Sequence, residues 1–341
     1  MKLPLIMDTH FGMRGNLSVI MDHQEEFFEN TFFPYLIENN IKEFIHGGDF
    51  FDNRKAVSVK IMARVRKIFL EKLVKHDIVM HLIPGNHDCY YKDTNDLSSV
   101  EEVLQHYPSN VKLHLDPNVV NFDGLNIAMI PWINPENYDQ VMDFLRTSKA
   151  SILVGHLELK GFEMIKGNVL STHGLDSNIF KRFEAVYTGH YHTKSSNDNI
   201  HYLGTPYEMT WSDADDPKFF HVLDTETREL QAIRNTSTLF NKLIYDDKLD
   251  GPFDTEYEQY AKTFVKVIVR NKTDLVKFDT YIDRLTKANP YDLKIIESFN
   301  EYLDESVDVD MAEVTDTVTL LNSYIDNVET NLDTQTLKTK M

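Results

Sequence analysis

Short apolar runs recur along the first two thirds of the chain, and polar side chains follow each run. The runs cover residues 3–7, 44–46, 78–83, 152–154 and 185–188, and such runs are typical of strands buried on both faces. Between the first three runs, apolar residues recur at helical spacing over 19–37 and 57–74. This order predicts parallel βαβ units, in which ligands bind beyond the carboxyl ends of the strands.

The rest of the first 240 residues adds more strands than helices. Asp123-Gly124 joins two apolar runs and predicts a hairpin. Helices are expected over 97–106, 135–146 and 176–183, and strands over 111–115, 119–122, 125–131, 201–203, 219–223 and 229–233. Two strand-rich layers with helices outside them follow, so the expected fold class is α/β, a four-layer α/β/β/α sandwich over residues 1–240.

After residue 245 the pattern changes. An acidic linker with Gly251-Pro252 precedes a strand at 263–269, a helix at 272–288 and a strand at 293–296. We expect a small α+β domain over 245–298 that caps the first domain or binds DNA. Over 299–341 we expect a helical tail, whose apolar stripe consists of Val314, Val318, Leu321, Ile325, Val328 and Leu332. The stripe packs either on the chain's own second domain or, as we favour, on a partner's coiled coil.

Metal-binding side chains stand directly after the apolar runs. The oxygen and nitrogen donors are Asp8, His10, Asp49, Asn86, His156, His190 and His192. Seven donors suffice for two divalent cations if Asp49 bridges them. Mixed oxygen and nitrogen ligands without thiolate suit Mn²⁺, Fe²⁺ or Zn²⁺ better than Ca²⁺ or an all-oxygen Mg²⁺ site. One such histidine alone is more often an ordinary polar residue, but five clusters at successive strand ends predict a metal-dependent phosphoester-cleaving site.

Charge and cysteine content narrow the function further. A net charge of -19 argues against attraction of the whole surface to nucleic acid, but not against a local groove. In the basic stretch (Arg54 to Lys75), eight Lys or Arg accompany one acidic residue, Glu71, so this stretch either contacts DNA or forms a solvated helix face. The single cysteine, Cys89, cannot form an intramolecular disulfide, and we expect a cytoplasmic protein without a membrane segment.

The ordered motifs resemble a known superfamily. The motifs are Asp8-Thr9-His10, Gly48-Asp49-Phe50-Phe51-Asp52, Gly85-Asn86-His87-Asp88, Gly155-His156 and Gly189-His190-Tyr191-His192. Together they are similar to the five motifs of calcineurin-like metallophosphoesterases. Within that superfamily, Ile130-Pro131-Trp132 and Tyr202-Leu203-Gly204-Thr205-Pro206 look most like SbcD-type DNA double-strand-break nuclease subunits, especially their bacteriophage recombination-endonuclease form. The resemblance covers most of the chain and weakens after residue 245.

The resemblance implies a role for each site residue. One metal would be held by Asp8, His10, Asp49 and His192, and the other by Asp49, Asn86, His156 and His190. His87 matches the family's catalytic histidine that is not a metal ligand, and Asp88 would orient His87 or His10. Asp52 stands where several members have a histidine, so its role stays open. Trp132 and Trp211 are expected to pack in the core, with base stacking as the alternative.

The resemblance also implies an activity and partners. We expect a Mn²⁺-dependent DNA exonuclease and structure-dependent endonuclease, with Mg²⁺, Fe²⁺ or Zn²⁺ as alternative metals. It would act on double-stranded DNA ends as a homodimer, with an SMC-like ABC ATPase, in the cytoplasm of the host if it is phage-encoded. The alternatives are a phosphatase of the same superfamily and a DNA-end tethering or regulatory subunit. Asp52-Asn53-Arg54 departs from the Asp-Arg-Gly motif of phosphoprotein phosphatases.

Overall fold

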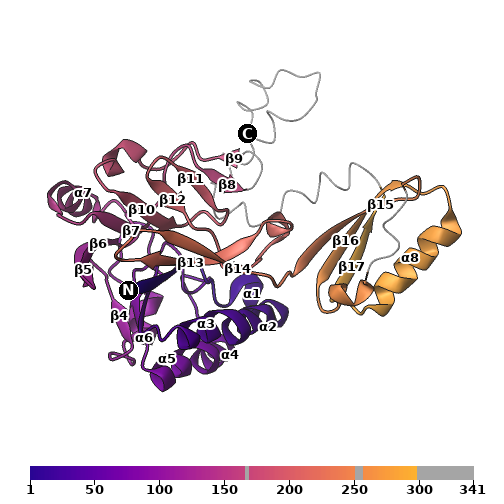
Figure 1. Ribbon diagram of the computed structural model, residues 1–341, viewed down its shortest axis with the longest axis horizontal. Coiled ribbons are helices and arrows are strands. Elements are labelled where there is room, and N and C mark those ends of the chain that lie inside the picture. Colours follow the sequence, from indigo (N-terminus) through magenta and orange to yellow (C-terminus); the bar gives the residue numbers. More distant parts are fainter. Residues whose placement is uncertain (166–168, 250–255, 298–341) are drawn as a thin grey trace, which may run out of the picture. The chain divides into compact units, whose positions relative to one another are not determined.

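The computed structural model describes residues 1–165, 169–249 and 256–297. The chain divides into two compact units (Figure 1). The first consists of the described residues of Met1–Met209 and Asp216–Leu239, and the second of Thr210–Asp215 and the described residues from Phe240 to 297. All the site residues expected from the sequence belong to the first unit. Within the described residues, no helix is long and apolar enough to cross a membrane.

Two six-stranded sheets form the centre of the first unit. The first sheet has the order β14-β13-β1-β2-β3-β4, in which β1 to β4 are parallel and β13 and β14 are antiparallel additions. Its strands are β1 (Lys2–Ile6), β2 (Glu43–His46), β3 (Val79–Leu82), β4 (Val111–Leu113), β13 (Lys218–Asp224) and β14 (Leu230–Asn235). The second sheet has the order β11-β12-β10-β7-β6-β5, with its four central strands parallel. Its strands are β5 (Asn118–Phe122), β6 (Leu125–Ile130), β7 (Ile152–His156), β10 (Ala185–Gly189), β11 (Ser195–Asn197) and β12 (Ile200–Tyr202).

The two sheets pack face to face. Leu5 and Ile45 of the first sheet share one buried cluster with Met129 and Val154 of the second. Each such side chain stabilises the fold by about 1.5–3 kcal/mol through burial. On the opposite face of the second sheet, a separate buried cluster joins its strands to α7 (Tyr138–Thr147). The two sheets thus lie between outer layers of helices (Figure 1), which confirms the predicted four-layer α/β/β/α sandwich.

The outer face of the first sheet is covered by two long helical segments. The first contains α2 (Ser18–Phe27), a π-helical turn (Phe28–Phe32) and α3 (Phe33–Glu38). The second contains α4 (Val59–Val65), a π-helical turn (Arg66–Leu70) and α5 (Glu71–His76). Phenylalanine rings fill the layer between these helices and the sheet: Phe28, Phe32, Phe44 and Phe69 are all fully buried. Two shorter segments are α1 (Met13–Asn16), in which Arg14 and Gly15 have left-handed φ values, and α6 (Ser99–Leu104).

Two local predictions need correction. The helix expected over 176–183 is only a 3₁₀ turn (Ser177–Phe180), capped by Asp176. The side-chain amide of Asn199 donates to the carbonyls of Phe180 and Phe183 at the end of this turn. A small hairpin of β8 (Glu163–Ile165) and β9 (Val169–Leu170) was not predicted.

In its described residues, the second unit contains a three-stranded parallel sheet, a 3₁₀ turn (Tyr257–Tyr260) and an α-helix. The strands are β15 (Phe240–Asp246), β16 (Phe264–Asn271) and β17 (Asp292–Ile296), and β16 is central. Helix α8 (Leu275–Lys287) contributes Phe278, Tyr281 and Leu285 to a core shared with the strands. Strand β15 was not predicted. The Gly251-Pro252 linker and the predicted helical tail at 299–341 lie outside the described residues.

Candidate metal centre

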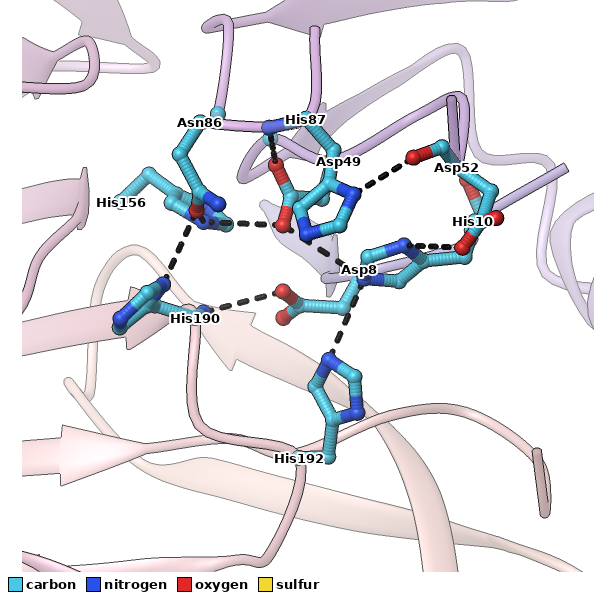
Figure 2. A network of polar contacts seen from close by, with 12 residues as sticks. Asp8, His10, Asp49, Asp52, Asn86, His87, His156, His190 and His192 are labelled. Atoms are coloured by element: carbon cyan, nitrogen blue, oxygen red, sulfur yellow. Dashed lines mark hydrogen bonds and ion pairs between the residues drawn. The ribbon is translucent and has the colours of Figure 1, made fainter. Parts of the chain in front are cut away.

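The strand ends bring the eight predicted site residues together in one place (Figure 2). Asp8 and His10 follow β1, Asp49 follows β2, and Asn86 and His87 follow β3 of the first sheet. From the second sheet come His156 at the end of β7, and His190 and His192 after β10. Donor atoms of Asp8, His10 and His192 lie within 4.8 Å of one another, and so do those of Asp8, Asp49 and His156. The two sheets thus supply opposite sides of one cluster.

The backbone of this cluster is unusual. Asp8, His10, Asp49 and His190 have φ values of 50°, 43°, 52° and 90°, in the left-handed region that non-glycine residues rarely adopt. Backbone hydrogen bonds between neighbouring loops hold them there. The N–H of Asp8 donates to the carbonyl of Gly48 at 3.1 Å, and that of His10 to the carbonyl of Asp49 at 2.9 Å. The loops after β1 and β2 therefore hold each other in place, and together they set the directions of the Asp8, His10 and Asp49 side chains.

Each aspartate of the cluster has one oxygen fixed by a backbone amide. The N–H of His190 donates to Oδ1 of Asp8 at 3.0 Å, and the N–H of His87 donates to Oδ1 of Asp49 at 2.8 Å. Oδ2 of Asp8 is buried without a hydrogen-bond partner. Oδ2 of Asp49 lies 3.5 Å from Nε2 of His10 and 3.3 Å from Nε2 of His156. Asp49 therefore lies between the first half of the cluster, which contains Asp8, His10 and His192, and the second half, which contains Asn86, His156 and His190.

The second half of the cluster surrounds Asn86. Its Oδ1 lies 3.1 Å from Nε2 of His156 and 3.0 Å from Nδ1 of His190. Nδ1 of His156 lies 2.9 Å from the carbonyl of Gly47, a contact that places the proton on Nδ1 and leaves the lone pair of Nε2 for a ligand. Nε2 of His190 is buried without a partner. Buried polar atoms rarely stay unpaired, so these donors are arranged for an additional ligand.

In the first half of the cluster, two histidines meet. Nε2 of His10 and Nε2 of His192 lie 3.2 Å apart. At that distance both nitrogens can donate their lone pairs to the same cation. Behind His10, its Nδ1 lies 3.3 Å from Oδ1 of Asp52. A carboxylate in that position favours the proton on Nδ1 and directs Nε2 into the cluster. This contact gives Asp52, whose role the sequence left open, a place next to His10.

The charges of the cluster are strongly coupled. Burial lowers the pKa of His10, but the Asp52 hydrogen bond and the charge of Asp49 outweigh it and raise that pKa to about 9. For His156, burial is likewise outweighed by Asp49, and the pKa rises to about 9. Burial raises the pKa of Asp8 to about 6. For Asp49, burial is outweighed mainly by His156, which holds the pKa of the carboxyl well below its ordinary value. At neutral pH, a cation would have to displace protons from His10 and His156.

These residues fit divalent metal ions. The buried, unpaired Oδ2 of Asp8 is a metal-ligand atom type, and Asp8 belongs to both clusters of donor atoms described above. Carboxylate, amide and imidazole donors without thiolate form a set that Mn²⁺, Fe²⁺ and Zn²⁺ all accept.

His87 lies at the edge of the cluster. Its Nδ1 is 2.5 Å from the backbone carbonyl of Asp52, and its ring meets that of His10 edge-on with centroids 4.8 Å apart. Because Nδ1 donates to the carbonyl, Nε2 is the nitrogen that can take or give a proton. Donor atoms of His10, Asp49 and His87 also lie within 4.8 Å of one another, so metal binding by His87 is a geometric alternative.

The role expected for Asp88 was wrong. Its buried carboxylate accepts hydrogen bonds from three backbone amides, those of Phe50 at 3.0 Å, Phe51 at 3.1 Å and Gly85 at 2.9 Å. Asp88 therefore ties the loop after β2 to the loop after β3, rather than orienting His87 or His10.

Two supporting residues were missed altogether. The side-chain amide of Gln24 in α2 donates to the carbonyl of Thr9 at 2.8 Å, and the hydroxyl of Tyr207 donates to the same carbonyl at 2.6 Å. Both side chains are fully buried and hold the Asp8-Thr9-His10 loop. One signal was available for Gln24. It is a polar residue on the buried face of an amphipathic helix, four positions from Ile20, where such residues are usually hydrogen-bonded to something essential.

The basic stretch serves partly in helix packing. Arg64 pairs with Asp22 at 2.7 Å and contacts Glu25, while Lys72 pairs with Glu29 at 2.5 Å. The exposed basic residues of the stretch are Lys55, Lys60, Arg66, Lys67 and Lys75. Contact of these residues with DNA stays a prediction.

Comparison with known proteins identifies the family. The family described as Calcineurin-like phosphoesterase (Metallophos) matches residues 5–194. The chain is 34% identical over 329 residues to exonuclease subunit 1 of Enterobacteria phage T4, covering 96% of this chain and 93% of that protein. It is 27% identical over 149 residues to the SbcD component of the SbcCD nuclease of Staphylococcus epidermidis, covering 42% of this chain and 38% of that protein. A solved archaeal phosphodiesterase aligns at 15% identity with a TM-score of 0.35, covering 69% of this chain and 100% of that one. By its family match and its five ordered motifs, the chain belongs to the calcineurin-like phosphoesterase family.

Proposed function

We propose that this protein is the nuclease subunit of a DNA recombination or repair complex and hydrolyses phosphodiester bonds at double-stranded DNA ends. The observation that carries the proposal is the convergence of seven metal-donor side chains from five strand ends on one cluster. Nearly the whole chain is similar to a phage protein named as a subunit of an exonuclease, and this similarity favours DNA as the substrate.

The cluster would hold two divalent cations, with Mn²⁺ as the first choice and Mg²⁺, Fe²⁺ or Zn²⁺ as alternatives. The first would be bound by Asp8, His10, Asp49 and His192, and the second by Asp49, Asn86, His156 and His190. The position of Asp49 Oδ2 within 3.5 Å of both His10 and His156 supports its bridging role. When bound, the two cations supply an activated water and stabilise negative charge on the phosphate oxygens.

The residues of this chain then have distinct tasks. The backbone amides of His87 and His190 hold the two aspartates, so that one oxygen of each stays directed into the cluster. His87 would give a proton to the leaving oxygen of the phosphodiester through Nε2, while the Asp52 carbonyl retains the proton on Nδ1.

The proposed partners follow from the relatives. Both relatives are named as subunits, which supports work in a complex. We propose an SMC-like ABC ATPase as the partner, a homodimer as the assembly, and the predicted tail at 299–341 as the docking segment. Exonuclease and structure-dependent endonuclease activity would use the same metal centre.

A cleavage assay on end-labelled duplex DNA tests the function. We expect digestion with Mn²⁺, with and without the ATPase, that a chelator abolishes. The Asp8→Asn variant should be inactive, because it alters a proposed ligand. The His106→Ser variant, which alters an exposed histidine outside every motif, should be fully active. Activity confined to phosphoprotein or nitrophenyl phosphate would show a phosphatase instead, and DNA binding without any hydrolysis would show a tethering subunit.

A further inference from the structure

An apolar cavity of about 460 Å³ opens beside the metal centre. Its wall includes Trp132, Ile133, Pro135, Tyr138, Glu158 and Leu175. This volume lies within the range of about 300–1,000 Å³ that pockets for small molecules span. His156 also lines the cavity, so the proposed metal centre and the cavity share a wall.

Trp132 lines the cavity and also contacts two histidines of the metal centre. Its ring lies 5.2 Å from that of His190, tilted by 40°, and 6.0 Å from that of His156, nearly edge-on at 67°. Trp132 is only half-buried, and Tyr138 at the rim is 40% exposed. Both aromatic residues therefore present surface to a ligand, as the alternative of base stacking by Trp132 requires.

The backbone of Trp132 is held rigidly. Its N–H donates to the carbonyl of Pro84 at 2.9 Å, directly before the loop that carries Asn86 and His87. Its carbonyl accepts from the side-chain amides of Asn95 and Asn137, each at 2.9 Å. This arrangement fixes the aromatic wall relative to the metal centre, and a preorganised wall loses little entropy when a ligand stacks on it.

We propose that this cavity, here called the base slot, takes the nucleobase of the nucleotide attached to the scissile phosphate. The base would be unstacked from its neighbours and would lie against Trp132, with its own phosphate at the histidines of the metal centre. The inference rests on the proposed function, because that function puts the phosphate there. Stacking on an aromatic ring accepts every base, since each has a π-face, so the slot would be tolerant of sequence.

The slot also gives a reason for cutting at ends. A base must leave the stack to enter it, and this is easiest where pairing is already weak, at a frayed terminus or in a single strand. A rigid wall placed next to the phosphate site thus selects terminal and unpaired nucleotides over the interior of a duplex.

Tryptophan fluorescence tests the slot directly, because the chain has only two tryptophans. Trp211 belongs to the second unit, where it packs on Phe240, and Trp211→Phe keeps an aromatic ring there. In that variant Trp132 is the sole reporter. With Mg²⁺ present, we expect deoxyadenosine monophosphate to quench the fluorescence saturably. Deoxyribose 5-phosphate should bind at least about 10-fold more weakly in calorimetry and should not quench, because it lacks the base.

Two variants in the otherwise native protein complete the test. Trp132→Ala should lose the base-dependent gain in affinity yet still bind deoxyribose 5-phosphate, which shows that it is folded. Trp132→Phe should keep most of the gain. The base slot would be overturned if the native protein bound deoxyadenosine monophosphate and deoxyribose 5-phosphate with equal affinity. It would also be overturned if Trp132→Ala kept the full difference in affinity between these two compounds. DNA cleavage is read separately. Quenching without cleavage would refute the nuclease function alone, and cleavage without any base-dependent binding would refute the slot alone.

Discussion

Replacing His87 by serine should separate catalysis from metal binding. His87 contributes both its ring and its backbone amide to the cluster, and the amide donates a hydrogen bond to Asp49. Serine keeps that amide. The ring, however, is the group that would protonate the leaving oxygen, and loss of a general acid lowers rates by about 10²–10⁴-fold. The activation barrier should therefore rise by about 3–5 kcal/mol.

The cost to folding should be much smaller. The variant loses the hydrogen bond between Nδ1 of His87 and the Asp52 carbonyl, at a partly exposed position. One such bond contributes about 0.5–1.5 kcal/mol to stability. The expected barrier increase exceeds this severalfold, so the loss of activity cannot be attributed to unfolding when the variant is assayed well below its melting temperature.

The assay measures cleavage of end-labelled duplex with Mn²⁺ and, in parallel, metal content after dialysis. His87→Ser should keep the metal content of the native protein while cleavage collapses. His106→Ser makes the same chemical change at an exposed site and should change neither quantity. His192→Ala, at a proposed ligand, should lose metal. If His87→Ser also lost about half of the metal, His87 would be a ligand and the proposed assignment would fail.

Three further perturbations test other parts of the cluster. Gly85→Ala should abolish metal binding in calorimetry, because a Cβ at that position would lie 2.1 Å from Oδ1 of Asp49; retained affinity would contradict the geometry. Metal affinity should rise between pH 6.5 and 8.5, and a plot of the logarithm of the affinity against pH should have a slope of about two. The reason is that cations must displace protons from His10 and His156, whose pKa values are both raised to about 9. A flat plot would refute this coupling of metal binding to proton release. The same two histidines should stabilise the metal-free protein fully below pH 6.5, a contribution lost as the pH rises through 9. Asp88→Asn should lower the free energy of unfolding, measured by denaturant titration, by about 2–4 kcal/mol, because the amide group that replaces one carboxylate oxygen cannot accept a hydrogen bond from a backbone N–H. A loss under about 1 kcal/mol would show that the loops after β2 and β3 stay together without the Asp88 carboxylate.

The strand ends were predictable because buried parallel strands appear as apolar runs. Such a run stops where the chain leaves the sheet, and the polar residue that follows is then placed at the sheet edge. This reasoning located Asp8, Asp49 and His156 without any knowledge of long-range contacts. It also predicted the four layers, since helical spacing between the runs implies helices that cover the sheet.

The elements that were missed depend on distant partners. Strand β15 includes Asn241 and Lys242, which interrupt its apolar pattern, and parallel pairing with β16 is what makes it a strand. The helix predicted over 176–183 is a single 3₁₀ turn, and the carbonyls of Phe180 and Phe183 at its end accept from Asn199 of another segment. Periodicity within a segment carries no information about such contacts.

Asp88 shows the same limit within the site. Its place next to His87 in sequence suggested that it orients a histidine, yet two of the three amides it accepts come from Phe50 and Phe51, more than thirty residues earlier in the chain. Neighbours in sequence share a loop, but a buried carboxylate is positioned by whichever donors the fold brings to it.

Backbone strain gives evidence for function that is independent of the donor types. Asp8, His10, Asp49 and His190 all have left-handed φ values, each of which costs about 1–3 kcal/mol for such residues. Glycine would relieve that cost at every one of these positions, and none has it. Left-handed φ values also occur away from the site, for example at Asp77 and Asp123, so it is their concentration in one cluster that points to a contribution from these side chains. Because three of these four residues also bear unpaired donor atoms or a carboxylate shared between two histidines, the strain and the chemistry coincide. Coincidence of strain, buried unpaired donors and convergent charge is expected where a fold is built around a ligand rather than around its own packing.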